Sequence, residues 1–125
     1  MRSSWEHLCE LAQAEVRATL AALPEPLRAR AQPLPLTFER APSPAFRAEG
    51  IAPDTLGLFT GPAFGDEEHC ASLLPPRIIL FLENLWDFAE GDEEIYRAEV
   101  RTTHLHELGH YLGLDEDELT ERGLD

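Results

Sequence analysis

The chain has 125 residues, which predicts one domain spanning residues 1–125 and large enough to bury a core without disulfides. It carries 24 acidic residues against 10 basic ones, all of them arginine, for a formal net charge of −14. A surface this acidic repels phosphate backbones and anionic lipid headgroups, so we expect neither nucleic acid nor a membrane as a partner.

Features that direct a chain to a membrane or an oxidising compartment are not found in the sequence. No apolar run is long enough to span a bilayer, and the first residues lack the apolar core of a secretion signal. The two cysteines, Cys9 and Cys70, do not make a disulfide framework. We therefore expect a soluble, cytoplasmic protein, with a monomer as the default state.

The first predicted element is an amphipathic helix over residues 5–23. Apolar side chains recur there at spacings of three and four, which forms one stripe for a core. Ser3 or Ser4 can cap its start, and Pro24 stops it. Cys9 falls on the stripe, so we interpret it as a small core residue.

Three short strands are predicted next. Residues 34–39 alternate apolar and polar side chains, and two prolines near their start favour an edge position. Residues 55–60 form a second strand, after a Pro- and Gly-containing loop over 41–54. Residues 77–83 are apolar on both faces, which favours a central strand.

The segment between the last two strands, residues 61–76, is too long for a tight hairpin turn and long enough to be functional. It contains the run Asp66-Glu67-Glu68-His69-Cys70. His69 and Cys70 beside three acids could bind a metal, but no second ligand pair at zinc-finger spacing follows elsewhere. We favour an exposed polar loop.

A long helix is predicted in the last third of the chain, from Asp92 to Leu112. Glu93 and Glu94 lie in its first turn, where the helix dipole favours acidic side chains. Gly113 follows as a candidate left-handed cap that ends the helix. Gly109 is unfavourable inside a helix, and close approach of a neighbouring strand is one explanation.

This helix contains two histidines in the order His106-Glu107-x-x-His110. Residues four apart lie about 40° from each other around a helix, so both imidazoles can reach one metal ion. Glu107 lies about 100° from His106, close enough to take a proton from a metal-bound water. The leucines of this segment cluster on the opposite arc, where they can pack: Leu105, Leu108 and Leu112. The alternative is a pair of solvated histidines beside an ordinary glutamate.

A catalytic zinc site needs a third protein ligand. Only 15 residues follow His110, so a second long helix has almost no chain from which to form. The near candidates are Asp115, Glu116 and Asp117. Asp115 also fits the N-cap of a last short helix over residues 116–122, so capping and metal binding can both apply here.

The spacing His106-Glu107-x-x-His110-x-x-Gly113-x-x-Glu116 resembles the signature of the small bacterial zincin-like metallopeptidases. In that pattern the last position is an acidic third ligand, most often Asp, and this chain has Glu116 there. The strong resemblance covers residues 99–119, and a looser one reaches residues 56–59 and 76–80. The metzincin pattern is also similar, but its last His is replaced here and no Met-turn can follow in so short a tail.

The resemblance implies an α+β chain with a minimal zincin-like fold. A small twisted mixed sheet of about three to four strands would pack on the N-terminal helix and on the long helix with the His-Glu-x-x-His segment. An edge strand of such a sheet could bind an extended peptide through its backbone.

The function implied is that of a zinc metallopeptidase acting on a peptide or protein substrate. One Zn²⁺ would be held by His106, His110 and Glu116, with Glu107 as the general base toward the zinc-bound water. Tyr111 is a candidate for binding a developing oxyanion, with packing as its other role, and Thr103 is a candidate partner behind the ligands.

Two other functional classes are compatible with the same residues. The first is a non-catalytic binding module in which the metal only ties down the last helix. The second is an acidic interaction protein without a metal.

Overall fold

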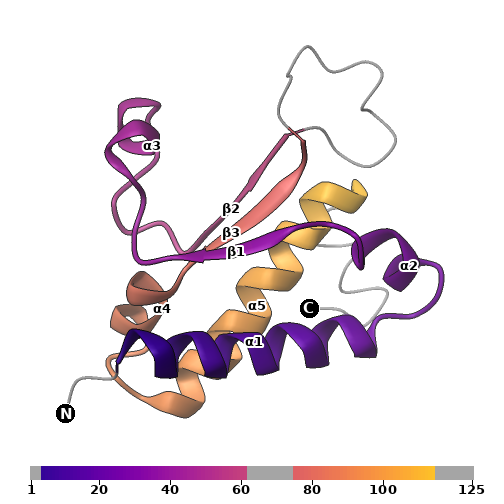
Figure 1. Cartoon of the computed structure of the whole chain (residues 1–125), viewed down its shortest axis with the longest axis horizontal. Helices are drawn as coiled ribbons and strands as arrows, with labels where there is room; N and C mark the ends of the chain where they lie inside the picture. Colours follow the sequence, from indigo (N-terminus) through magenta and orange to yellow (C-terminus); the bar gives the residue numbers. More distant parts are fainter. Residues whose placement is uncertain (1–3, 62–74, 115–125) are drawn as a thin grey trace.

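A computed structural model describes residues 4–61 and 75–114 of the chain. Figure 1 shows long helices on one side of a small sheet. The elements in this part of the chain follow the order α1 (Trp5–Ala22), α2 (Leu27–Ala31), β1 (Leu36–Glu39), α3 (Pro44–Ala48), β2 (Gly57–Thr60), β3 (Arg77–Phe81), α4 (Leu82–Phe88) and α5 (Glu93–Leu112).

The predicted N-terminal helix is confirmed as α1. Of the two candidate caps, Ser4 is the one that acts, because its side-chain oxygen accepts a hydrogen bond from the His7 backbone N–H at 3.1 Å. The helix ends at Ala22, before Pro24. Cys9 is half-buried and packs against the core rather than inside it.

The strands form a mixed sheet in the order β1-β3-β2. β1 runs parallel to β3 with Leu36 opposite Ile78, whereas β2 runs antiparallel to β3 with Gly57 opposite Leu80. The central position predicted for the apolar third strand is therefore confirmed, and its residues from Ile78 to Phe81 are fully buried. β2 and β1 are the edges of the sheet among the described residues.

The third strand is shorter than predicted. β3 ends at Phe81, and Leu82 already begins α4, so the apolar run over residues 77–83 belongs to two elements. A buried strand and the buried start of a helix have the same composition, which is why periodicity does not separate them.

The segment over residues 41–54, predicted as a loop, contains the short helix α3. Ser43 caps it by accepting from the Phe46 N–H at 3.3 Å, and Pro44 occupies the first turn, where its missing N–H costs nothing. β1 and β2 begin at Leu36 and Gly57, two residues later than predicted in each case.

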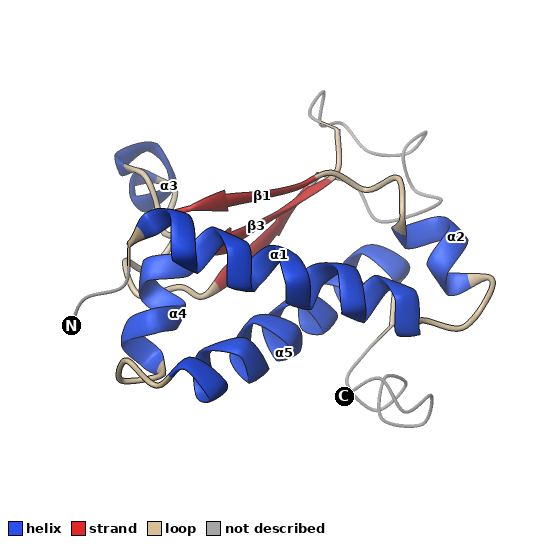
Figure 2. Cartoon of the chain, turned by 60° about the horizontal axis from the view of Figure 1, so that its bottom comes forward, coloured by secondary structure: helices blue, strands red, loops and turns tan. Residues whose placement is uncertain are grey.

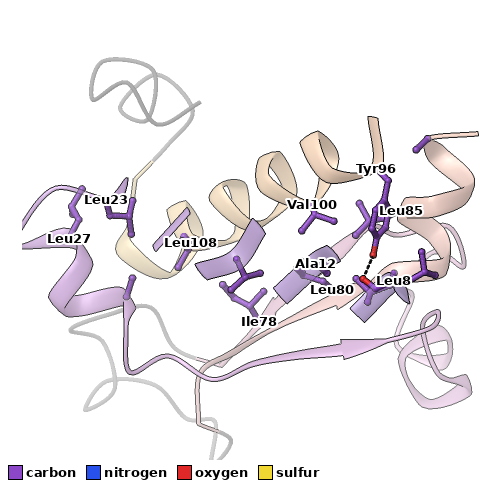
Figure 3. Packing of buried hydrophobic residues seen from close by; sticks show 14 residues of the cluster. Leu8, Ala12, Leu23, Leu27, Ile78, Leu80, Leu85, Tyr96, Val100 and Leu108 are labelled. Atoms are coloured by element: carbon purple, nitrogen blue, oxygen red, sulfur yellow. Dashed lines mark hydrogen bonds between the residues drawn. The ribbon is translucent and has the colours of Figure 1, made fainter. Parts of the chain in front are cut away.

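Helices α1 and α5 lie side by side beneath one face of the sheet (Figure 2). Tyr96 of α5 donates its buried hydroxyl proton to the Leu8 carbonyl of α1 at 2.9 Å (Figure 3). Arg97 pairs with Glu15 across the same helices at 2.8 Å. The core between these helices and the sheet consists of buried side chains from every layer: Leu8, Ala12, Val16, Leu23, Leu27, Ala31, Ile78, Leu80, Leu82, Leu85, Ala89, Tyr96, Val100 and Leu108.

Helix α5 begins and ends where the sequence predicts. The Asp92 side chain accepts from the Ile95 N–H at 3.0 Å and caps the N-terminus. Gly113 has a φ of 74°, a left-handed conformation that few other residues adopt, and it ends the helix. Within the described residues, no helix is both long and apolar enough to cross a membrane.

Candidate metal centre

The two histidines of the predicted ligand pair lie next to each other near the C-terminal end of α5. Their ring centroids are 4.7 Å apart, with the planes inclined by 55°. A tetrahedral zinc with Zn–N distances of about 2.0–2.1 Å separates the ring centroids of two histidine ligands by about 5 Å. His106 is half-buried and His110 is exposed, so the pair is spaced and accessible as a shared metal ion requires.

Glu107 lies between these histidines in sequence but faces the sheet. Glu107 is buried, with 8% of the residue exposed, and the backbone N–H of Phe59 in β2 lies close enough to favour its charged form. Its Oε2 lies 3.9 Å from Nδ1 of His110. The carboxylate is therefore held beside the histidine pair and shielded from bulk water.

The surroundings of Glu107 raise the pKa of its carboxyl group. Burial is the main cause, and it is partly offset by His110, by His106 and by the Phe59 N–H, which all favour the charged form. A carboxylate with a raised pKa is a stronger proton acceptor than one in water. The site thus holds a carboxylate suited to general-base chemistry.

Strand β2 packs very closely on this part of α5. A Cβ placed on Gly57 would lie 2.6 Å from Cγ2 of Thr103 and 3.5 Å from Cγ of Glu107. Helix α5 and strand β2 are therefore in close contact at Gly57. A glycine inside a strand is a known sign of close backbone approach, and it was the available signal for this residue.

The outer edge of β2 faces the site. Phe81 of β3 donates its N–H to the Leu56 carbonyl at 3.0 Å, and ladder bonds in an antiparallel pair involve every second residue. Leu58 and Thr60 therefore bond toward β3, while the backbone polar groups of Gly57 and Phe59 point outward. An outward-pointing Phe59 N–H agrees with the effect of this backbone group on the Glu107 carboxylate.

The two candidate accessory residues are both buried. Tyr111 is 6% exposed and packs its ring on Phe59 with centroids 5.7 Å apart, which is the packing role considered for it. Thr103 is 9% exposed and lies under Gly57 with its methyl group toward the strand. Both contribute to the contact between α5 and β2.

His104 lies on the opposite side of α5, in the core. It is 1% exposed, and its Nδ1 has no hydrogen-bond partner in the part of the chain that the structure describes. Burial lowers its pKa to about 4, so the ring is neutral at physiological pH. His104 precedes His106 by two residues, and a separation of two residues on a helix places side chains on different sides.

The candidates for the third ligand, Asp115, Glu116 and Asp117, lie outside the described residues, as do His69 and Cys70 of the 61–76 segment. Within the described residues, 4–61 and 75–114, the structure contains no group of three or more His, Cys, Asp or Glu side chains that could hold a metal ion. A third ligand for the histidine pair would therefore have to come from outside the described residues.

Comparison with known proteins supports a family assignment. The model of the family described as zincin-like metallopeptidase matches residues 32–124, which includes the whole sheet and all of α5. No curated protein and no solved structure matches the chain. The mixed sheet over the long helix agrees with the predicted minimal zincin-like α+β fold. The chain therefore belongs to the zincin-like metallopeptidase family, a membership that implies zinc binding and a hydrolase of the metallopeptidase class.

Proposed function

We propose that this chain is a zinc-dependent metallopeptidase in which His106, His110 and Glu116 hold the metal. The observation that carries the proposal is the pair of imidazoles 4.7 Å apart on α5, next to the buried carboxylate of Glu107. Bound zinc would supply the Lewis acid that polarises the scissile carbonyl and lowers the pKa of a water.

Glu107 is the proposed general base. Its raised pKa, caused mainly by burial, favours accepting a proton from the attacking water and passing it to the leaving amine. The Phe59 N–H keeps the carboxylate directed while the proton is transferred. The position of Glu107 beside His110, with 3.9 Å between Oε2 and Nδ1, keeps the base next to the metal ligands.

The proposed substrate is a peptide in extended conformation. The outer edge of β2 presents the backbone groups of Gly57 and the carbonyl of Phe59, and an extended peptide can add to such an edge by main-chain hydrogen bonds. The net charge of −14 favours cationic peptides over acidic ones.

The test is hydrolysis of a fluorescence-quenched peptide library by the zinc-loaded protein and its Glu107→Gln variant. We expect Glu107→Gln to keep one zinc and to lose activity by about a hundred- to ten-thousandfold, the usual contribution of a general base. Glu99→Gln, the same change two turns earlier on α5, is the matched control and should keep its activity. Equal rates for wild type and Glu107→Gln would contradict the proposed role.

A non-catalytic, metal-stabilised binding module is the outcome if no peptide in the library is cleaved although zinc is bound. In that case chelation should unfold the protein, because the metal would serve only to hold α5 and the following chain.

A further inference from the structure

We propose that Gly57 and Phe59 of β2 are positioning residues for Glu107, an inference that rests on the proposed function. Phe59 orients the carboxylate through its backbone N–H, and Gly57 allows the strand to come close enough for that bond to form. Neither role depends on side-chain chemistry.

The backbone N–H of Phe59 points away from the sheet, toward the outer edge of β2. In the antiparallel pair of β2 and β3, Phe59 lies opposite Ile78, a position whose polar backbone groups point away from β3. On an edge strand such an N–H would normally face water. Here the Phe59 backbone favours the charged form of the buried Glu107 carboxylate, as an N–H directed at its oxygens does. A bond to a charged acceptor is stronger than one between neutral groups, so it restricts the carboxylate effectively.

Gly57 leaves no space for a side chain between β2 and α5. A Cβ there would meet the Thr103 methyl carbon at 2.6 Å, Leu80 Cδ2 at 3.3 Å and Glu107 Cγ at 3.5 Å. The contact with Thr103 is too short for any side chain, and Thr103 is β-branched and buried on a helix, so it has little freedom to rotate away. A residue other than glycine would therefore push β2 away from α5.

The consequence falls on Glu107, because Phe59 is only two residues from Gly57 on the same strand. Moving the strand outward lengthens the bond from the Phe59 N–H to the carboxylate. Glu107 then keeps its place on the helix but loses the group that orients its oxygens. A displacement of about 1 Å at a reacting group can cost on the order of a hundredfold in rate.

The experiment compares Gly57→Ala with the double variant Gly57→Ala/Thr103→Ser. Replacing Thr103 by Ser removes the methyl carbon that the new Cβ would meet, and it keeps the hydroxyl. We expect Gly57→Ala to bind one zinc with kcat lowered on the order of a hundredfold. Thr103→Ser should restore most of this loss. Thr102→Ser, the same change at the exposed neighbouring residue, should restore nothing.

Amide hydrogen exchange of Phe59, measured by NMR in the metal-free protein, provides a readout independent of activity. We expect the Phe59 amide to exchange at least about tenfold more slowly than an open edge amide, since a hydrogen bond to a charged group protects it. Gly57→Ala should remove this protection, and Thr103→Ser should bring it back. If Gly57→Ala does not fold, the wild-type exchange rate and the double variant still decide the matter.

The results separate this inference from the proposed function. If the wild type cleaves no peptide, the proposed function fails, while protection of Phe59 that is lost in Gly57→Ala and regained with Thr103→Ser supports the geometry. An unprotected Phe59 amide in the wild type overturns the inference. Full activity of Gly57→Ala, or rescue by Thr102→Ser as strong as by Thr103→Ser, overturns it as well.

Discussion

The two sides of helix α5 place the same residue type in opposite environments. On the side toward α1, His104 is 1% exposed, and its pKa is lowered to about 4. On the side toward the edge of β2, the ring centroids of His106 and His110 lie 4.7 Å apart, with His106 half-buried and His110 exposed. One helix therefore contributes a buried histidine to the core and two neighbouring histidines to the surface.

The difference lies in what surrounds each imidazole. His104 packs in the hydrophobic core with Nδ1 unpartnered among the described residues, so it is held neutral by burial alone. His106 and His110 lie nearer the surface, with the carboxylate of Glu107 3.9 Å from Nδ1 of His110. Mutations on the first side should thus change stability, and mutations on the second should change metal binding.

The largest expected effect is a difference in the free energy of unfolding between substitutions at Leu108 and at His110, which lie two residues apart on α5. Leu108 is 2% exposed and packs toward Leu23 and Leu27 (Figure 3). Leu108→Ala should lower the free energy of unfolding by about 2–5 kcal/mol, because it leaves a cavity in the core. His110→Ala, at an exposed position, should change the free energy of unfolding of the metal-free protein by less than about 0.5 kcal/mol.

Urea unfolding of both variants in the presence of a chelator measures these values. Comparable losses of stability in Leu108→Ala and His110→Ala would show that the two sides of the helix are not distinct.

A smaller effect on stability is expected from the buried His104, and it depends on pH. In the unfolded chain its pKa returns to about 6.5, whereas in the folded protein it is about 4. The unfolded state therefore binds a proton first, and the stability present above pH 6.5 is lost as the pH falls toward 4. The loss approaches about 3 kcal/mol at the acid end of this window, at about 1.4 kcal/mol per pH unit.

His104→Leu removes the titrating group and the unpartnered nitrogen together. The difference in free energy of unfolding between His104→Leu and wild type, both without metal, should grow in favour of the variant from pH 7 to pH 4.5. Chemical denaturation at several pH values measures it. A difference that stays constant with pH would mean that His104 is not held neutral by burial.

Much of the fold follows from local signals. The ends of α5 are predictable because Asp92 and Gly113 act through their own backbone neighbourhood. The boundary between β3 and α4 is not, because Phe81 and Leu82 are equally apolar and only their tertiary position separates strand from helix. The helix α3 is missed because a chain of five residues has too few positions to show a period.

The candidate site divides in the same way. His106, Glu107 and His110 are found from their spacing, since one helix turn brings them together. Phe59 and Gly57 are not, because their contribution is a backbone N–H and a missing side chain, which appear only when β2 is placed on α5. Spacing within one element is visible in a sequence, whereas contact between elements depends on the whole fold.

The central proposal is that the exposed side of α5 binds zinc through its two histidines. Mass spectrometry of the native protein, beside His106→Ala and Glu107→Gln, measures the metal directly. We expect one zinc per chain in the wild type and in Glu107→Gln, and none in His106→Ala. Zinc retained by His106→Ala, or no metal in any of the proteins after zinc is added, would contradict the proposed site.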